Sequence, residues 1–310
     1  LKSIEDRYNT NLLFSSFKGK RKLSAFLLSG NTGQDGLSWQ DNEKYGGDND
    51  NISMSMDDDG GMMYVWRGGG TDDEPEVNTE NGFIKNINAG LQYSNKWNDK
   101  QTLNISPKYN SQIYNNGLTN FTQTQIGDSI LNENAATVTN INRNNFKTNV
   151  TYDIKIDSNN SIKFTAKANF YHTESEEYRN ADTRGGNGTL KNITNRLLKT
   201  NSDKESLYGS VLFKHKFKKP RRTISLNADW NLLTTESSNY LKSNNRDFFN
   251  GFTLIEDQLR ETDKTTQKLS VKAVYTEPLS KKYSMEVSHE VSYNSGTNNQ
   301  LTYGYTSATG

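Results

Sequence analysis

Hydrophobic and polar residues alternate along the stretch from Gln267 to Tyr293. Apolar residues occupy every second position up to Tyr275, and the alternation resumes at Met285. A period of two predicts β-strands that have one apolar face and one polar face. The segment 278–282 between the two runs is charged and begins with a proline, which predicts a short turn. The stretch is therefore predicted to be a β-hairpin.

The same pattern recurs along the chain. Short polar or charged segments separate pairs of alternating runs at five places in all: 17–22, 97–101, 157–160, 218–221 and 278–282. Their centres lie about 60 to 80 residues apart, so about ten strands are joined alternately by short turns and by longer connections at 33–82, 115–145, 173–204 and 239–265. This alternation is typical of a transmembrane antiparallel up-and-down β-barrel. A soluble sandwich or propeller would instead show turn signals every ~8–12 residues.

The alternation also predicts which residues share a face of the sheet. We expect one apolar set to face lipid: Leu91, Ile105, Val150, Phe164, Val211, Leu226, Val271 and Val287. We expect a polar set to face the lumen: Gln92, Asn104, Lys163, Asn227, Lys272 and Glu286. The physical reason is that Lys or Arg on the lipid face costs about 2–4 kcal/mol at mid-bilayer. Pro107 falls on an apolar position of its strand, which predicts a bulge or an irregular ladder there.

Aromatic residues gather near the predicted short turns. Seven of them form a predicted girdle at the membrane–water interface: Phe17, Trp97, Phe217 and Tyr283 beside the turns, and Tyr93, Tyr152 and Tyr275 a few residues further in. Amphipathic rings favour the headgroup level of a bilayer. The ordinary β-propensity of aromatic residues is the alternative explanation of the same placement.

Composition narrows the class of protein. The 310 residues are 31% hydrophobic and 11% aromatic, with a formal net charge of +1. Such a chain is poor in aliphatic residues for a globular core but too aromatic for a disordered one. Near-zero net charge without a basic stripe gives no support for nucleic-acid binding. Cysteine is absent, which excludes disulfides and thiolate metal sites, and no apolar run is long enough for a transmembrane helix.

The predicted connection 33–82 is a long acidic loop rich in Gly and Met. Acidic residues at Asp48, Asp50, Asp57, Asp58 and Asp59 are the candidate ligands for a structural Ca²⁺, because closely spaced carboxylates suit a hard cation. A solvated acidic loop is the alternative, since the spacing is not that of an EF-hand. Four methionines in the same loop predict that it binds a partner or packs in an ordered way over the barrel mouth.

Three stretches resemble the outer-membrane β-barrel of Bacteroidota TonB-dependent-receptor-like proteins. They are GLQYSNKWNDKQTLNISPKYN (Gly90–Asn110), DSILNENAATVTNINRNNFKTNVTYDIKIDSNNSIKF (Asp128–Phe164) and YTEPLSKKYSMEVSHEVSYN (Tyr275–Asn294). LSAF (Leu23–Phe26), followed by GLSWQDNEKYGG (Gly36–Gly47), is similar to the first outer-loop region of this family. The resemblance implies a barrel of roughly 22 strands, of which residues 1–310 would form a partial barrel domain. The plug domain, the TonB box and the terminal strands of such proteins are not expected within it.

The resemblance implies a location in the bacterial outer membrane and a role in ligand binding and uptake. Its implied partners are outer-membrane lipid, TonB acting through the absent plug region, and a surface lipoprotein or other envelope-complex protein. A non-transporting barrel that scaffolds an envelope complex is the alternative, and a soluble adhesin-like β-protein is a third. His172, His215 and His289 are scattered over different strands without a Ser–His–acid grouping, so we expect neither an enzyme nor a cofactor.

The polar face also predicts that these strands do not close into a small barrel. Around ten strands would leave an interior that is largely filled by side chains. Lys, Glu, Asn and Ser are frequent on the polar positions, and a small dry interior would leave many of them without partners. We therefore expect an open, curved sheet.

Overall fold

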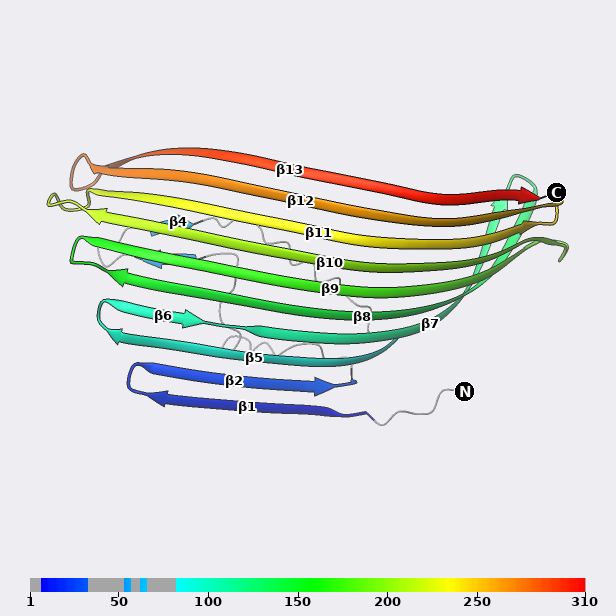
Figure 1. Ribbon diagram of the computed structural model, residues 1–310, viewed down its shortest axis with the longest axis horizontal. Helices are drawn as coiled ribbons and strands as arrows, with labels where there is room; N and C mark the ends of the chain where they lie inside the picture. The colour runs from blue at the N-terminus through cyan, green and yellow to red at the C-terminus, as the bar shows by residue number, and fades with distance from the viewer. Residues whose placement is uncertain (1–6, 33–52, 57–61, 66–81, 310) are drawn as a thin grey trace.

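The protein is a single open antiparallel β-sheet with a separate small hairpin (Figure 1). The computed structural model describes residues 7–32, 53–56, 62–65 and 82–309. The main sheet contains β1 (Asn9–Lys18), β2 (Arg21–Gly30), β5 (Gly82–Asn98), β6 (Gln101–Ile105), β7 (Lys108–Ile126), β8 (Ser129–Lys155), β9 (Asn160–Gly185), β10 (Leu190–Lys216), β11 (Thr223–Asp247), β12 (Phe252–Pro278) and β13 (Ser284–Thr309). β3 (Ser53–Met56) pairs only with β4 (Met62–Val65). No helix among the described residues is long and apolar enough to span a membrane.

Each long strand pairs with the strands that precede and follow it in the chain. β6 and β7 together occupy one position between β5 and β8, so the sheet has ten strand positions, as the hairpin pattern predicted. The interruption between them falls at Pro107, where an irregular ladder was expected. The gap is bridged by backbone bonds from the Ser106 amide to the Asn149 carbonyl (2.9 Å) and from the Leu91 amide to the Pro107 carbonyl (3.0 Å).

All five predicted short turns are present, and they lie together at one end of the sheet (Figure 1). The turn between β1 and β2 consists of Gly19 and Lys20, with Gly19 at a φ of 60°. At the opposite end, Gly127 holds the same first turn position between β7 and β8 at a φ of 59°. A positive φ at this position matches the right-handed twist of paired strands and favours glycine.

The predicted long connections 115–145, 173–204 and 239–265 were wrong. These residues continue the strands, which turn at 127–128, 186–189 and 248–251 instead. Asn, Ser and Thr were interpreted as loop formers because they occupy both faces, which removes the apolar alternation. Their backbones nevertheless pair in unbroken ladders, so β8, β10 and β12 reach 27 residues each. At ~3.3 Å per residue such a strand is about 90 Å long, far more than a bilayer requires.

The strand register confirms that the two predicted sets lie on opposite faces of the sheet. Residues of the apolar set are matched with one another or with other apolar residues across adjacent strands, as in the pairs Ile105–Val150 and Phe164–Val211. Residues of the polar set lie on the opposite face. That polar face is the more enclosed one, because Thr151, Thr165 and Ser270 on it are buried. An isolated flat sheet would expose both faces alike, so the polar side is the inside of the curve.

The sheet is open, as predicted. β1 and β13 are the terminal strands of the order, and no ladder joins them. Each therefore presents one edge with unpaired backbone groups in the part of the chain that the structure describes.

The close approach of β2 to β5 depends on one glycine. A Cβ on Gly90 would lie 2.3 Å from the ring of Phe26, which packs over it from β2. We expect Gly90→Val to displace this ring and to lower the free energy of unfolding by about 1–3 kcal/mol, the usual cost of overpacking. Gly117→Val is the control, because nothing lies within 4 Å of a Cβ there. Equal unfolding free energies of the two variants in a urea titration would contradict this account.

Candidate functional site

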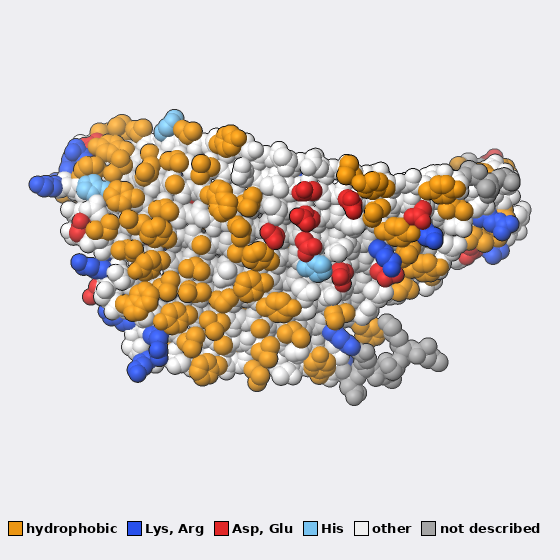
Figure 2. Space-filling view, viewed as in Figure 1, with side chains coloured by type: hydrophobic (Ala, Val, Ile, Leu, Met, Phe, Trp, Pro, Cys, Tyr) orange, Lys and Arg blue, Asp and Glu red, His pale blue; other side chains and the backbone are white. Residues whose placement is uncertain are grey.

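The apolar face carries a band of exposed hydrophobic side chains beside the short turns. Figure 2 shows this band covering the part of the sheet that adjoins the turns. Large side chains in it, such as Phe164 (40% exposed), Leu226 (46%) and Val287 (53%), are covered by no second layer of described residues. On β9 the band runs from Ile162 to Phe170, which is close to the ~9–11 residues that a tilted strand needs to cross a bilayer.

Six of the seven predicted girdle residues lie at the turn end of this band. Trp97 packs edge-on against Tyr152 at 6.3 Å between ring centroids, and Phe217 packs in the same way against Tyr275. Tyr93 shares their face through its register with Ile105. Tyr283 lies in the last short turn and is 70% exposed.

Phe17 was wrongly grouped with this girdle. Its register partner is Lys22, which pairs with Ser94 of the polar face. The apolar positions of β1 are instead Leu12 and Phe14, opposite Leu27 and Ala25. Leu12, Leu13 and Phe14 are consecutive, so β1 is apolar on both faces. Alternation alone therefore did not show which face Phe17 occupies.

The polar face is held together by side-chain bonds across the strands. Arg179 pairs with Glu133 and Arg196 pairs with Glu177, each at 2.7 Å. Nearer the short turns, the Tyr208 hydroxyl donates to Asp229 at 2.6 Å. Similar bonds join amides and hydroxyls, as between Asn104 and Thr151 and between Ser210 and Asn227. The face is thus a wettable surface of amides, hydroxyls and paired charges, which suits the wall of an aqueous lumen.

An acidic patch on the apolar face ends the hydrophobic band (Figure 2). It consists of seven exposed carboxylates on β9 to β12: Glu174, Glu176, Asp203, Glu205, Glu236, Glu261 and Asp263. Asp203 and Glu236 are register partners, and so are Glu236 and Asp263. Carboxylates directly opposite one another repel and must stay hydrated. The patch therefore marks the end of the part of this face that an apolar environment could cover.

His172 lies in the acidic patch between two of its carboxylates. Its Nδ1 is 2.7 Å from Asp203 and its Nε2 is 3.6 Å from Glu174. The hydrogen bond with Asp203 raises the pKa of His172 above its usual value, against the opposing effect of desolvation. Glu174 is near His172 in the sequence, whereas the proximity of Asp203 depends on the pairing of β9 with β10.

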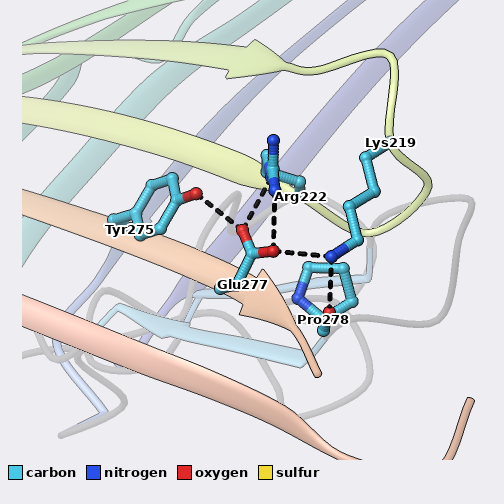
Figure 3. A network of polar contacts seen from close by, with 5 residues as sticks. All are labelled: Lys219, Arg222, Tyr275, Glu277 and Pro278. Atoms are coloured by element: carbon cyan, nitrogen blue, oxygen red, sulfur yellow. Dashed lines mark hydrogen bonds and ion pairs between the residues drawn. The ribbon is translucent and has the colours of Figure 1, made fainter. Parts of the chain in front are cut away.

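At the short-turn end of the sheet, Glu277 links two neighbouring short turns (Figure 3). Arg222 donates to its carboxylate through Nε (2.6 Å) and Nη2 (2.7 Å), Lys219 through Nζ (2.6 Å), and Tyr275 through its hydroxyl (2.6 Å). Arg222 and Lys219 flank the β10–β11 turn, whereas Glu277 precedes the β12–β13 turn. These donors hold the pKa of Glu277 far below its usual range, with Arg222 the largest cause.

Comparison with known proteins assigns no family. No family model matches the sequence, and no curated protein matches it. The crystal structure of the toluene transporter TbuX of Ralstonia pickettii is similar over 95% of this chain and 80% of its own, with a TM-score of 0.25 and 9% identity. That of the P. putida toluene transporter TodX covers 95% of this chain and 81% of its own, with a TM-score of 0.28 and 9% identity. Scores this low carry no conclusion about this chain.

The predicted calcium ligands lie outside the described residues. This applies to all five, Asp48, Asp50, Asp57, Asp58 and Asp59, and to most of the acidic loop 33–82. Within the residues that are described, no group of three or more His, Asp or Glu side chains is arranged to hold a metal ion.

The Glu277 network predicts a response of the short turns to acid. Because the pKa of Glu277 is lower in the folded state than in the unfolded state, its ionised carboxylate stabilises the fold at pH values above the ordinary carboxyl pKa of ~4.3. This stabilisation is lost as the pH falls through the pKa of the folded state. We expect Glu277→Gln to reduce amide-exchange protection in turns 217–222 and 279–283 at neutral pH. The wild type should approach the variant only well below pH ~4.

Glu286→Gln is the matched control for this prediction. Glu286 is an exposed carboxylate on the neighbouring β13 that makes no hydrogen bond in the described part of the chain. The Glu286→Gln substitution should leave the amide-exchange protection of both turns unchanged. Equal protection in the Glu277 variant and the wild type would show that the network does not hold the turns.

Proposed function

We propose that this chain forms part of the wall of an outer-membrane β-barrel that binds a ligand and admits it across the membrane. The observation that carries the proposal is the separation of the two faces of a single-layer sheet. One face exposes a contiguous apolar band about as tall as the hydrocarbon core of a bilayer, and the other is enclosed and polar. Soluble proteins rarely expose apolar patches larger than a few hundred Å², whereas lipid solvates such a band at no cost.

The strand architecture supports the same proposal. In the described sheet, the long strands contact only their ladder neighbours, so no second layer covers the apolar face as it would in a sandwich. From one end of the sheet toward the other, the short turns, the aromatic girdle, the apolar band and, on β9 to β12, the acidic patch follow one another. This is the order expected from the periplasmic interface to the outer surface. The strand ends beyond the acidic patch would then project outside the membrane.

Uptake driven through TonB rests on the family resemblance of the sequence. Ligand binding and passage rest on the polar face, which offers amides, hydroxyls and charged pairs to a lumen. The scaffold alternative uses the same barrel without transport. Swelling of vesicles that contain the full-length protein, measured with sugars and amino acids of graded size, separates the two. Solute-dependent swelling supports uptake, and its absence with an intact TonB region favours the scaffold.

Cysteine labelling tests the membrane placement directly. The chain has no native cysteine, so Asp128→Cys and Ser158→Cys introduce single thiols at opposite ends of the strands. In intact Gram-negative cells, a membrane-impermeant maleimide should label position 128, whereas position 158 should react only after the outer membrane is permeabilised. Labelling of both thiols in intact cells, or recovery of the protein in the soluble fraction, would refute the proposal.

A further inference from the structure

A groove crosses the apolar face just beyond the hydrophobic band. It encloses about 410 Å³ and spans five adjacent strands, β7 to β11. Its floor consists of two register rows, one side chain per strand: Ile113–Asn142–Glu174–Asn201–Ser238 and Asn115–Asn140–Glu176–Lys199–Tyr240. Neighbouring strands are ~4.8 Å apart, so the four steps make the floor about 19 Å long. The groove therefore suits an extended chain that lies across the strands.

The polar groups of the groove are mainly uncommitted amides. Asn115, Asn140, Asn142 and Asn201 make no hydrogen bonds with other described residues. Each amide offers donors and an acceptor together, which is the combination that a hydroxyl group needs.

The charges in and beside the groove disfavour anionic ligands. Lys199 is the cation of the floor, and it already pairs with Glu176 at 3.4 Å. Anions are repelled by Asp203 and Glu236, which lie in the adjacent row of the acidic patch. Together with the amides, this repulsion of anions favours a neutral molecule that is rich in hydroxyl groups, with the half-buried ring of Tyr240 at one end of the floor.

The position of the groove indicates where this molecule comes from. It lies on the lipid-facing side of the wall, four residues beyond Phe170 at the top of the apolar band. A solute that crosses the barrel would meet the opposite face. A lipid whose acyl chains pack on the band, however, would extend a long headgroup to this level, ~13 Å above it.

We propose that the groove binds the neutral oligosaccharide headgroup of an outer-leaflet glycolipid. This inference rests on the proposed membrane placement and adds a specific lipid to it. The glycolipid would bind as an annular ligand, with its chains on the hydrophobic band and its sugars across β7 to β11. The amides of the two register rows would donate to and accept from the sugar hydroxyls.

Native mass spectrometry of the protein released from nanodiscs tests this inference. The discs contain a dialkyl lipid with a neutral maltotetraose headgroup and the same lipid with a phosphoglycerol headgroup. We expect the maltotetraose lipid to be retained preferentially. Asn140→Ala/Asn142→Ala should weaken its retention roughly tenfold, because each lost bond contributes about a factor of a few to ten. Asn134→Ala is the control, since Asn134 lies on the same face of β8 outside the groove and should change nothing.

The remaining outcomes discriminate among ligands. Preferential retention of the phosphoglycerol lipid, or equal retention by the wild type and the double variant, overturns the inference. Binding of free maltotetraose as tight as that of the lipid form also overturns it, because the ligand would then be a soluble saccharide. Cysteine labelling keeps this test separate from the proposed function. A correctly labelled protein without glycolipid preference refutes the groove alone, whereas a mislabelled protein refutes the membrane wall.

Discussion

Val271→Lys should lower the free energy of unfolding in lipid vesicles by about 2–4 kcal/mol. Val271 is 40% exposed at the middle of the apolar band on β12, between Ala228 and Val291 of the adjacent strands. A lysine there must carry its charge into hydrocarbon or draw water and headgroups toward it. The measurement is a reversible urea or guanidinium titration of the protein folded into thin-bilayer vesicles.

Two further variants isolate the charge from other effects. Thr266→Lys places the same side chain on the same strand but on the polar face, at an exposed position. It should cost far less, because water or the lumen solvates it. Val271→Ala removes apolar area without adding charge and should cost about 1 kcal/mol. If the two lysine variants were equally destabilised, the apolar face would not be the lipid face.

The part of the fold nearest the short turns could be predicted from the sequence. Between Ile162 and Phe170, for example, strict alternation separates an apolar face from a polar one, as expected if one face meets lipid and the other meets water. The same alternation made the hairpins and the division of the sheet into two faces predictable. Pro107 was identified as a defect for a separate reason, since its missing N–H interrupts any ladder.

The distal halves of the strands could not be predicted in this way. In the proposed placement both faces of the sheet meet water beyond the acidic patch, so alternation is no longer required and Asn, Ser and Thr occupy either parity. Residues such as Thr194 and Ser243 were therefore interpreted as loop, although the backbone ladder continues through them. What makes them strands is pairing with neighbours that are far away in the sequence, and a local pattern does not contain that information.

The acidic patch and the groove were missed for the same reason. Each consists of side chains from several strands that become neighbours only through the register. Glu174 and Glu236 are 62 positions apart in the sequence, yet they lie in adjacent rows of one face. The available signal was that carboxylates occupy the apolar parity of β9 to β12 at similar distances from their short turns. Counting positions from the turns, rather than along the chain, would have revealed it.

The two edges of the open sheet have an energetic consequence in a membrane. Within the band, alternate N–H and C=O groups of β13 point away from β12, with no partner in the described chain. Each unsatisfied backbone group in hydrocarbon costs several kcal/mol, so a bare edge would cost on the order of tens of kcal/mol. The edges of β1 and β13 must therefore pair with other strands whenever the sheet is in a bilayer.

Disulfide trapping shows which strands those are. For residues 1–310 alone in vesicles, we expect single-cysteine Ser288→Cys protein to form cross-linked dimers through paired β13 edges. Ser15→Cys, combined in turn with cysteine at each polar-face position of β13 from Ser284 to Asn298, should give no intramolecular disulfide. Val274→Cys/Ser288→Cys is the positive control, because these residues are register partners and should cross-link within one chain. An intramolecular bond from position 15 to β13 would mean that ten strands close into a small barrel, with the lysines and amides of the polar face packed inside it.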